Sequence, residues 1–146
     1  CRLDACFHGR PATDRSYVSG LPMPYDLSFW REVKPAGDPQ VLYGQVLDDI
    51  DVDGLSPLPL EQIKRRFAVE FPAIHDQGAQ MYWEGGGSYF QLSWPPDPVN
   101  ALLVTCGHQL PGETMNRIIE IANQFGCALY DPQAGERFHQ PEPTAG

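Results

Sequence analysis

Residues 111–133, PGETMNRIIEIANQFGCALYDPQ, predict a helix, a glycine stop and a short strand. The apolar residues follow the i, i+3, i+4, i+7 spacing of one helix face: Met115, Ile118, Ile119 and Ala122. The polar residues between them are expected to face solvent: Glu113, Asn116, Arg117, Glu120 and Asn123. Gly126 suits the left-handed backbone at a helix C-terminus. The apolar strand at 127–130 then ends at Asp131-Pro132, because proline cannot donate to a β-ladder.

Two more helices are predicted upstream of this segment. Asp38 followed by Pro39 is typical of an N-cap and the first helical position. The apolar stripe expected for that helix consists of Leu42, Val46 and Leu47. The next helix is predicted over residues 60–71 and ends before Pro72. Its inward side is expected to carry Leu60, Ile63, Phe67 and Phe71.

Period-two patterns predict the strands. Residues 80–83 and 88–94 flank Glu84-Gly85-Gly86-Gly87, which is typical of a hairpin turn. Residues 99–105 are more continuously apolar, which predicts a central strand. A first strand is expected just after Met23, with Leu27 and Phe29 on one side. The sequence therefore predicts an α+β fold in the order β-α-α-β-β-β-α-β, an antiparallel sheet of about four to five strands with helices packed on one face.

The predicted domain organisation is simple. Residues 23–138 are expected to form a single domain, since this length can bury a sizeable core. Residues 1–22 show neither helical nor strand periodicity and are expected to be a flexible extension from outside the domain. An alternative interpretation of this segment is the start of a mature lipoprotein, which would also begin with cysteine. Residues 139–146 are expected to be a flexible tail.

The charge of the chain restricts its partners. Ten basic and nineteen acidic residues give a net charge of −9, and residues 23–146 hold seven and seventeen of them. A negative field repels nucleic acid and anionic membranes and attracts basic partners, although acidity also serves solubility alone. No apolar run approaches the ~20 residues of a membrane span, and no signal-peptide pattern is visible. We therefore expect a cytoplasmic protein with reduced cysteines.

The densest charge cluster is the sequence DDIDVDG, with Asp48, Asp49, Asp51 and Asp53. From Asp49 to Gly54 it matches the opening of a calcium loop. The twelfth position, which needs a bidentate glutamate, is Leu60, and so no metal site is predicted. Two interpretations stay open: an acidic loop that is only solvated, and an acidic loop that meets a basic partner.

Catalytic motifs are weak. Cys106-Gly107-His108 places a thiol near an imidazole, but no third group that would orient them is identifiable, so a structural cysteine is favoured. Gly85-Gly86-Gly87 lacks the lysine of a phosphate loop. No cofactor is predicted. Several aromatic residues could stack on bases, but the acidic charge favours a packed sheet face: Tyr82, Trp83, Tyr89, Phe90 and Trp94.

Two segments, MPYDLSFW at residues 23–30 and GCALYDPQ at 126–133, resemble a family of small bacterial cytosolic proteins. Members begin with M-x-Y/F-D-L-x-x-W and finish with an apolar strand followed by YDPQ. They are often encoded beside secreted polymorphic toxins, so the resemblance implies an immunity role. The similarity covers both ends of residues 23–133 and, more loosely, the order of elements between them. The motifs consist mostly of packing and turn residues and carry over no active-site residue.

Charge and resemblance together predict an immunity protein that binds one cognate toxin and covers its basic active-site cleft. The toxin could be a nuclease or a nucleotide-modifying enzyme, and neither nucleic acid nor membrane is an expected partner. The expected contact residues are Asp48, Asp49, Asp51, Asp53 and Glu84. The alternatives are a small hydrolase that uses Cys106 and His108, or an accessory protein of a secretion locus.

Overall fold

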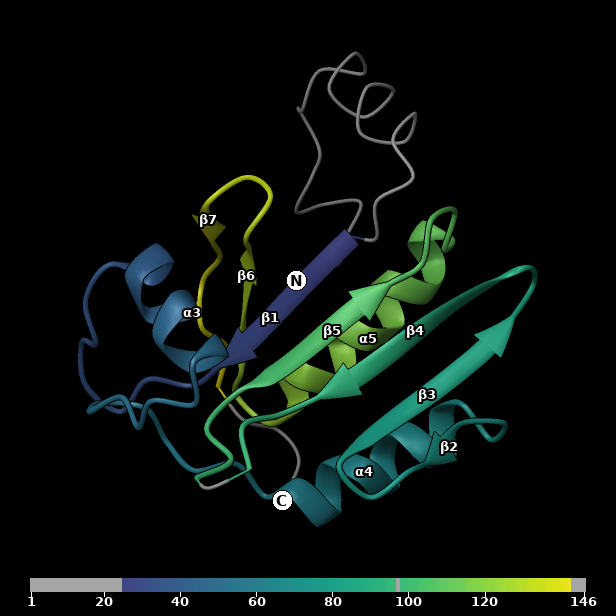
Figure 1. The fold of residues 1–146 in the computed structure, drawn as a ribbon, viewed down its shortest axis with the longest axis horizontal. Helices are drawn as coiled ribbons and strands as arrows, with labels where there is room; N and C mark the ends of the chain where they lie inside the picture. The colour runs from purple at the N-terminus through teal and green to yellow at the C-terminus, as the bar shows by residue number, and fades with distance from the viewer. Residues whose placement is uncertain (1–24, 97, 143–146) are drawn as a thin grey trace.

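A computed structural model describes residues 25–96 and 98–142 of the chain (Figure 1). The expected extension, residues 1–22, lies outside the described residues. Three helices and seven strands follow one another in this part of the chain: β1 Tyr25–Trp30, α3 Pro39–Leu47, α4 Leu60–Glu70, β2 His75–Asp76, β3 Gln80–Gly85, β4 Ser88–Ser93, β5 Leu102–Cys106, α5 Gly112–Gln124, β6 Ala128–Asp131 and β7 Glu136–Arg137.

All seven strands form one antiparallel sheet in the order β2-β3-β4-β5-β1-β6-β7. The α+β class, the antiparallel sheet and the central position of β5 are confirmed. The expected number of four to five strands and the expected order of elements are wrong, because β2 and β7 add a strand to either edge. Each of these strands has two residues, too few to show an alternating pattern.

The helices cover both faces of the sheet, whereas all of them were expected on one. Leu27 and Phe29 of β1 pack with residues of α4 and α5 in the larger core, and Figure 1 shows α5 behind β4 and β5. Trp30 points to the other face, because side chains alternate along a strand. There it packs in a second core with Leu42 of α3 and Tyr130 of β6. The expectation failed because the apolar stripe of α3 indicates which side of the helix is buried, but not which face of the sheet the helix covers.

Most local predictions are confirmed. The carboxylate of Asp38 accepts a hydrogen bond from the backbone N–H of Gln40, and Pro39 is the first helical residue. Gly126 has a φ of 82°. Two expectations are wrong: Leu47 is 50% exposed rather than inward, and Asn116 is buried rather than solvent-facing.

The hairpin between β3 and β4 is tighter than expected. Both strands extend to Gly85 and Ser88, which leaves a two-residue turn. Gly86 and Gly87 have φ values of 60° and 80°, and the favoured two-residue hairpin turn needs positive φ at both positions.

The segments at 23–30 and 126–133 contain two neighbouring antiparallel strands, β1 and β6. The Tyr25 hydroxyl donates a hydrogen bond to the Asp131 carboxylate over 2.7 Å, across 106 positions of the sequence. The rings of Trp30 and Tyr130 lie 5.3 Å apart between centroids. Both motifs therefore contribute to the same junction, between β1 and β6, and their conspicuous residues stabilise the fold.

Two glutamine side chains extend the hydrogen bonding of β1 at its ends. The amide group of Gln133 accepts from the N–H of Asp26 over 2.6 Å and donates to its carbonyl over 2.8 Å. Gln140 makes the same pair of bonds with Glu32, over 2.8 Å and 3.0 Å. We call these contacts the glutamine clamps. The second clamp anchors one residue of the stretch that was expected to be a tail.

Candidate protein-binding surfaces

The acidic cluster forms the loop that leaves α3. Asp48 is the C-cap of the helix, and Asp49 has a left-handed backbone with a φ of 59°. The buried side chains of Val52 and Leu55 hold the loop against the second core. Asp53 is paired with Lys34, whose ammonium lies 2.7 Å from its carboxylate and lowers the pKa of that carboxyl.

The other three carboxylates of this loop, on Asp48, Asp49 and Asp51, are exposed. No ion pair is found for them within residues 25–96 and 98–142. Like charges so close in sequence repel one another, and only solvent or a partner can offset that repulsion. They are therefore the part of the cluster that is available to a basic partner.

Exposed apolar side chains lie beside these carboxylates. Val41 and Leu47 of α3 are 59% and 50% exposed, and Ile50 of the loop is 47% exposed. Val41 and Leu47 each lie three positions from Gly44, so the three residues are neighbours on the outer side of the helix. A Cβ at Gly44 would find no atom within 4 Å, which leaves that side of α3 open. We call Val41, Leu47, Ile50, Asp48, Asp49 and Asp51 the α3 patch.

Most basic side chains in the described part of the chain are occupied by internal ion pairs. Seven lysines and arginines lie in the described part of the chain, and five of them have a carboxylate within 4 Å. The pairs are Lys34–Asp53, Lys64–Asp76, Arg66–Glu70, Arg117–Glu70 and Arg137–Glu32. The Arg117 guanidinium also lies 4.7 Å from the ring centroid of Phe71. Little positive charge is left among the described residues to offset the acidic surface.

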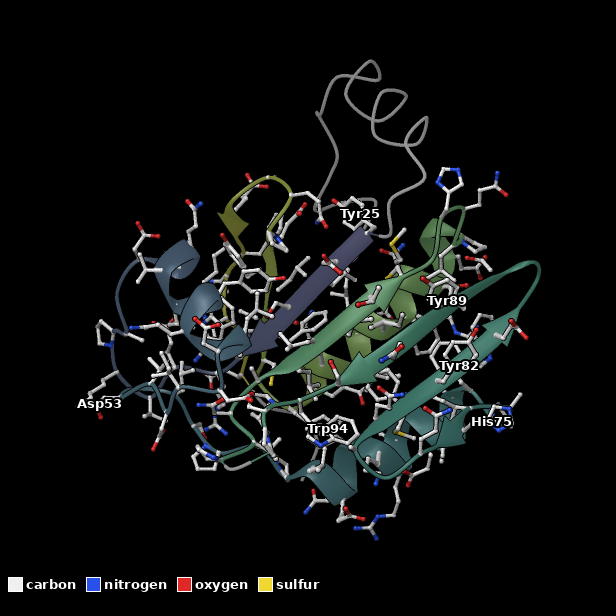
Figure 2. All side chains as sticks on the ribbon, in the orientation of Figure 1. Tyr25, Asp53, His75, Tyr82, Tyr89 and Trp94 are labelled. Atoms are coloured by element: carbon white, nitrogen blue, oxygen red, sulfur yellow. The ribbon has the colours of Figure 1, made fainter. Side chains whose placement is uncertain are left out.

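Glu84 does not belong to the α3 patch. It lies on β3, where its carboxylate accepts a hydrogen bond from the Tyr82 hydroxyl over 3.2 Å. Figure 2 shows Asp53 and Tyr82 on opposite sides of the molecule. The five expected contact residues are therefore divided between two surfaces.

The second surface is the side of β3, β4 and β5 that faces away from α4 and α5. Residues directly opposite in paired strands share a face. The register therefore places a polar row across five strands: His75, Tyr82, Gln91, Thr105 and Asp26. Among the described elements only α3 packs on this side, over β1 and β6, and the row residues on β3, β4 and β5 stay half-buried.

Tyrosines dominate one part of this surface, where Figure 2 shows Tyr82 and Tyr89 on neighbouring strands. Their rings are stacked, with centroids 5.7 Å apart and planes inclined by 22°. Gly107 leaves the space that the Tyr89 ring occupies, since a Cβ there would lie 2.6 Å from its Cδ1 atom. The expected packed aromatic face is therefore divided: Trp83 and Phe90 contact the core, whereas Tyr82 and Tyr89 do not.

Asp26 ends the polar row beside α3. Its carboxyl is half-buried, and this burial raises its pKa, although a hydrogen bond from Thr105 acts in the opposite direction. Burial raises the pKa of Tyr43 on α3, and the charge of Asp26 acts in the same direction. Sequence reasoning missed Asp26, Gln91 and Thr105. The only signal in the sequence was that each of them is a polar residue in a strand whose side chains alternate between two faces. Which of them lie side by side depends on the register between the strands.

The structure does not bring Cys106 and His108 together as a reactive pair. Cys106 is fully buried in the larger core, and burial raises the pKa of its thiol far above the usual value. His108 is exposed in the loop after β5. A thiolate nucleophile needs the opposite environment, accessible and electropositive.

Within the part of the chain that the structure describes, no three His, Cys, Asp or Glu residues are grouped to hold a metal ion. The absence of calcium binding stays a prediction. None of the described helices has the length and apolarity required to cross a bilayer. Comparison with protein-family models, curated proteins and solved structures finds no match to this chain.

Proposed function

We propose that this chain is an immunity protein that neutralises one basic protein toxin, with the α3 patch as its contact surface. The observation that carries the proposal is the adjacency of exposed apolar side chains, Val41, Leu47 and Ile50, to three carboxylates that have no ion pair among the described residues. An apolar centre with a polar rim is the usual anatomy of a protein–protein interface. The charge of the rim requires a partner whose own rim is basic.

Net charge supports the same partner. The chain carries −9, and most of its described cations are used internally. A field of this sign accelerates encounter with a basic protein. Enzymes that act on nucleic acids or nucleotides bind polyanions, so their clefts are commonly basic. An acidic inhibitor can cover such a cleft without any catalysis of its own.

The test uses the protein encoded by the neighbouring gene as the candidate toxin. Cells that express it should survive when the full chain is co-expressed, and the two purified proteins should form a complex. Ile50→Lys should weaken that complex about thirtyfold, which corresponds to ~2 kcal/mol at a central interface position. It should also reduce protection.

Val69→Lys is the matched control, because Val69 is a 74% exposed valine on α4, outside the α3 patch. It should bind and protect as well as the wild type. Equal effects of both substitutions would contradict the contact surface. Absence of protection by the wild-type chain would contradict the proposed function and favour an accessory role.

A further inference from the structure

We propose that the side of the sheet facing away from α4 and α5 binds an extended, arginine-bearing segment of a basic protein partner. The surface consists of Asp26, Tyr82, Glu84, Tyr89, Gln91 and Thr105, and we call it the tyrosine face. The inference rests on the proposed function for the basic nature of the partner. It adds a second contact surface, separate from the α3 patch.

The charges of the tyrosine face select a cation. It presents the two carboxylates of Asp26 and Glu84, and neither lysine nor arginine stands on this side of β1, β3, β4 or β5. The register places Arg137 of β7 on this side as well, but its guanidinium is paired with Glu32. The Asp26 carboxyl is half-buried, with a hydrogen bond from Thr105 but no cation partner in the described chain. A guanidinium would supply the missing charge at both positions.

The aromatic pair selects arginine over lysine. Glu84 pairs directly with Tyr89 across the β3–β4 ladder, and its carboxylate already contacts the Tyr82 hydroxyl. A planar guanidinium can stack on a tyrosine ring while it bonds a neighbouring carboxylate with two parallel N–H groups. Ammonium groups lack both the planarity and the fork of donors.

The spacing of the carboxylates indicates an extended ligand. Asp26 and Glu84 are three strands apart, which corresponds to about 15 Å at the usual distance between neighbouring strands. An extended chain advances ~3.3 Å per residue and presents residues i and i+4 on the same side. Two arginines four positions apart therefore fit the two carboxylates. The amide of Gln91 and the hydroxyl of Thr105 lie in the row between Asp26 and Tyr82, two residues from Glu84 on β3, where they can bond the peptide backbone.

The experiment is an NMR titration of the full chain, labelled with nitrogen-15. The probe is the blocked peptide acetyl-GRSGSRG-amide, with arginines four positions apart. Its control replaces both arginines with citrulline, which keeps the shape and removes the charge. The arginine peptide should shift the backbone amides of β3, β4 and β5 with a dissociation constant in the millimolar range, and the citrulline peptide should leave them unchanged.

Two variants locate the binding. Glu84→Gln with Asp26→Asn keeps the shape of both side chains and should weaken binding of the arginine peptide about tenfold. Asp49→Asn with Asp51→Asn makes the same change in charge on the α3 patch and should leave it unchanged.

Three results would overturn the inference: shifts confined to the α3 patch, equal binding of the citrulline peptide, or equal binding by the Glu84 and Asp26 variant. None of them bears on protection from the toxin. Failure of this inference is therefore distinguishable from failure of the proposed function.

Discussion

At the scale of single residues, two glycines with opposite surroundings have opposite predicted effects. A Cβ at Gly107 would lie 2.6 Å from the Tyr89 ring, so Gly107→Ala should lower the free energy of unfolding by about 2 kcal/mol, the usual cost of overpacking. Gly44 lies inside α3 with open space around it, so Gly44→Ala should raise that free energy by about 0.5–1 kcal/mol. Urea denaturation measures both. A Gly107→Ala variant as stable as the wild type would contradict the close contact with Tyr89.

The buried cysteines should be inert in the native protein. Burial raises the pKa of Cys127 to about 12 and that of Cys106 further still, so thiolate is scarce at pH 8. We expect iodoacetamide to alkylate neither residue in buffer and both in urea, as measured by peptide mass spectrometry. Rapid native alkylation of Cys106 would instead favour the hydrolase alternative. The double variant Cys106→Ala, His108→Ala should still protect cells from the toxin, provided that its melting temperature shows a folded protein.

At the scale of elements, the glutamine clamps predict separate local effects at the two ends of β1. Gln133→Ala should increase hydrogen exchange at the amide of Asp26, and Gln140→Ala should do so at Glu32, because each loses its acceptor. We expect each change to cost about 1 kcal/mol of stability, the net value of ordinary hydrogen bonds. NMR-detected exchange resolves the two sites. An equal change at both amides in either variant would indicate general unfolding instead.

The ion pair between α4 and α5 predicts an acid-dependent term in stability. Two bonds from the Arg117 guanidinium, 2.6 and 2.8 Å long, lower the pKa of Glu70 below its usual 4.5. A lowered folded-state pKa stabilises the protein above the unfolded-state pKa, and that contribution disappears as pH falls through the folded-state value. Glu70→Gln should thus cost about 1 kcal/mol at pH 7, and the difference from wild type should shrink below pH 4.5. Urea denaturation between pH 3 and 7 tests this, with Glu113→Gln as an exposed control.

These elements also show how much of the fold the sequence predicts. Helix bounds came from periodicity and caps, and Asp38 and Gly126 have the predicted roles because capping is a local property. Asn116 was misplaced because a polar side chain at a buried helical position resembles an exposed one in sequence. The face that α3 covers depends on contacts with Trp30 and Tyr130, which are distant in the chain. The two edge strands, β2 and β7, are too short to show an alternating apolar pattern in the sequence.

At the scale of the whole molecule, the acidic field predicts faster association with a basic partner. Asp49→Asn with Asp51→Asn should slow association with the toxin about tenfold at low salt, because rim charges act mainly on the encounter rate. The deficit should shrink as salt shortens the Debye length below ~10 Å. Asn also tolerates the left-handed backbone at position 49. Stopped-flow kinetics across ionic strengths measures the effect.

The control for this measurement is Glu113→Gln with Glu142→Gln, which makes the same change in net charge at exposed positions outside the α3 patch. It should slow association much less. Equal rates for wild type and the Asp49 and Asp51 variant at low salt would mean that the loop is only a solvated connection.

The candidate surfaces were only partly predictable from sequence. The acidic loop is visible in composition, because its four aspartates lie within six residues. Its apolar neighbours Val41 and Leu47 were not predictable as part of a surface. Leu47 was expected to be buried, and its exposure follows from the rotation of α3 about its own axis. The tyrosine face needs the alignment of four strands, which no single segment encodes.

During synthesis, β1 is made long before the strands that pair with it. Its partners on both sides, β5 and β6, come much later in the chain, and Tyr25 meets Asp131 only 106 residues downstream. A ribosome that adds 5–20 residues per second needs roughly 5–20 s for that stretch. Until β5 has been made, the apolar side chains of the nascent β1 have no strand beside them, and one side of β1 stays unpaired until β6 follows. Chains whose synthesis stops before β6 would therefore leave one side of β1 unpaired and become substrates of chaperones and proteases.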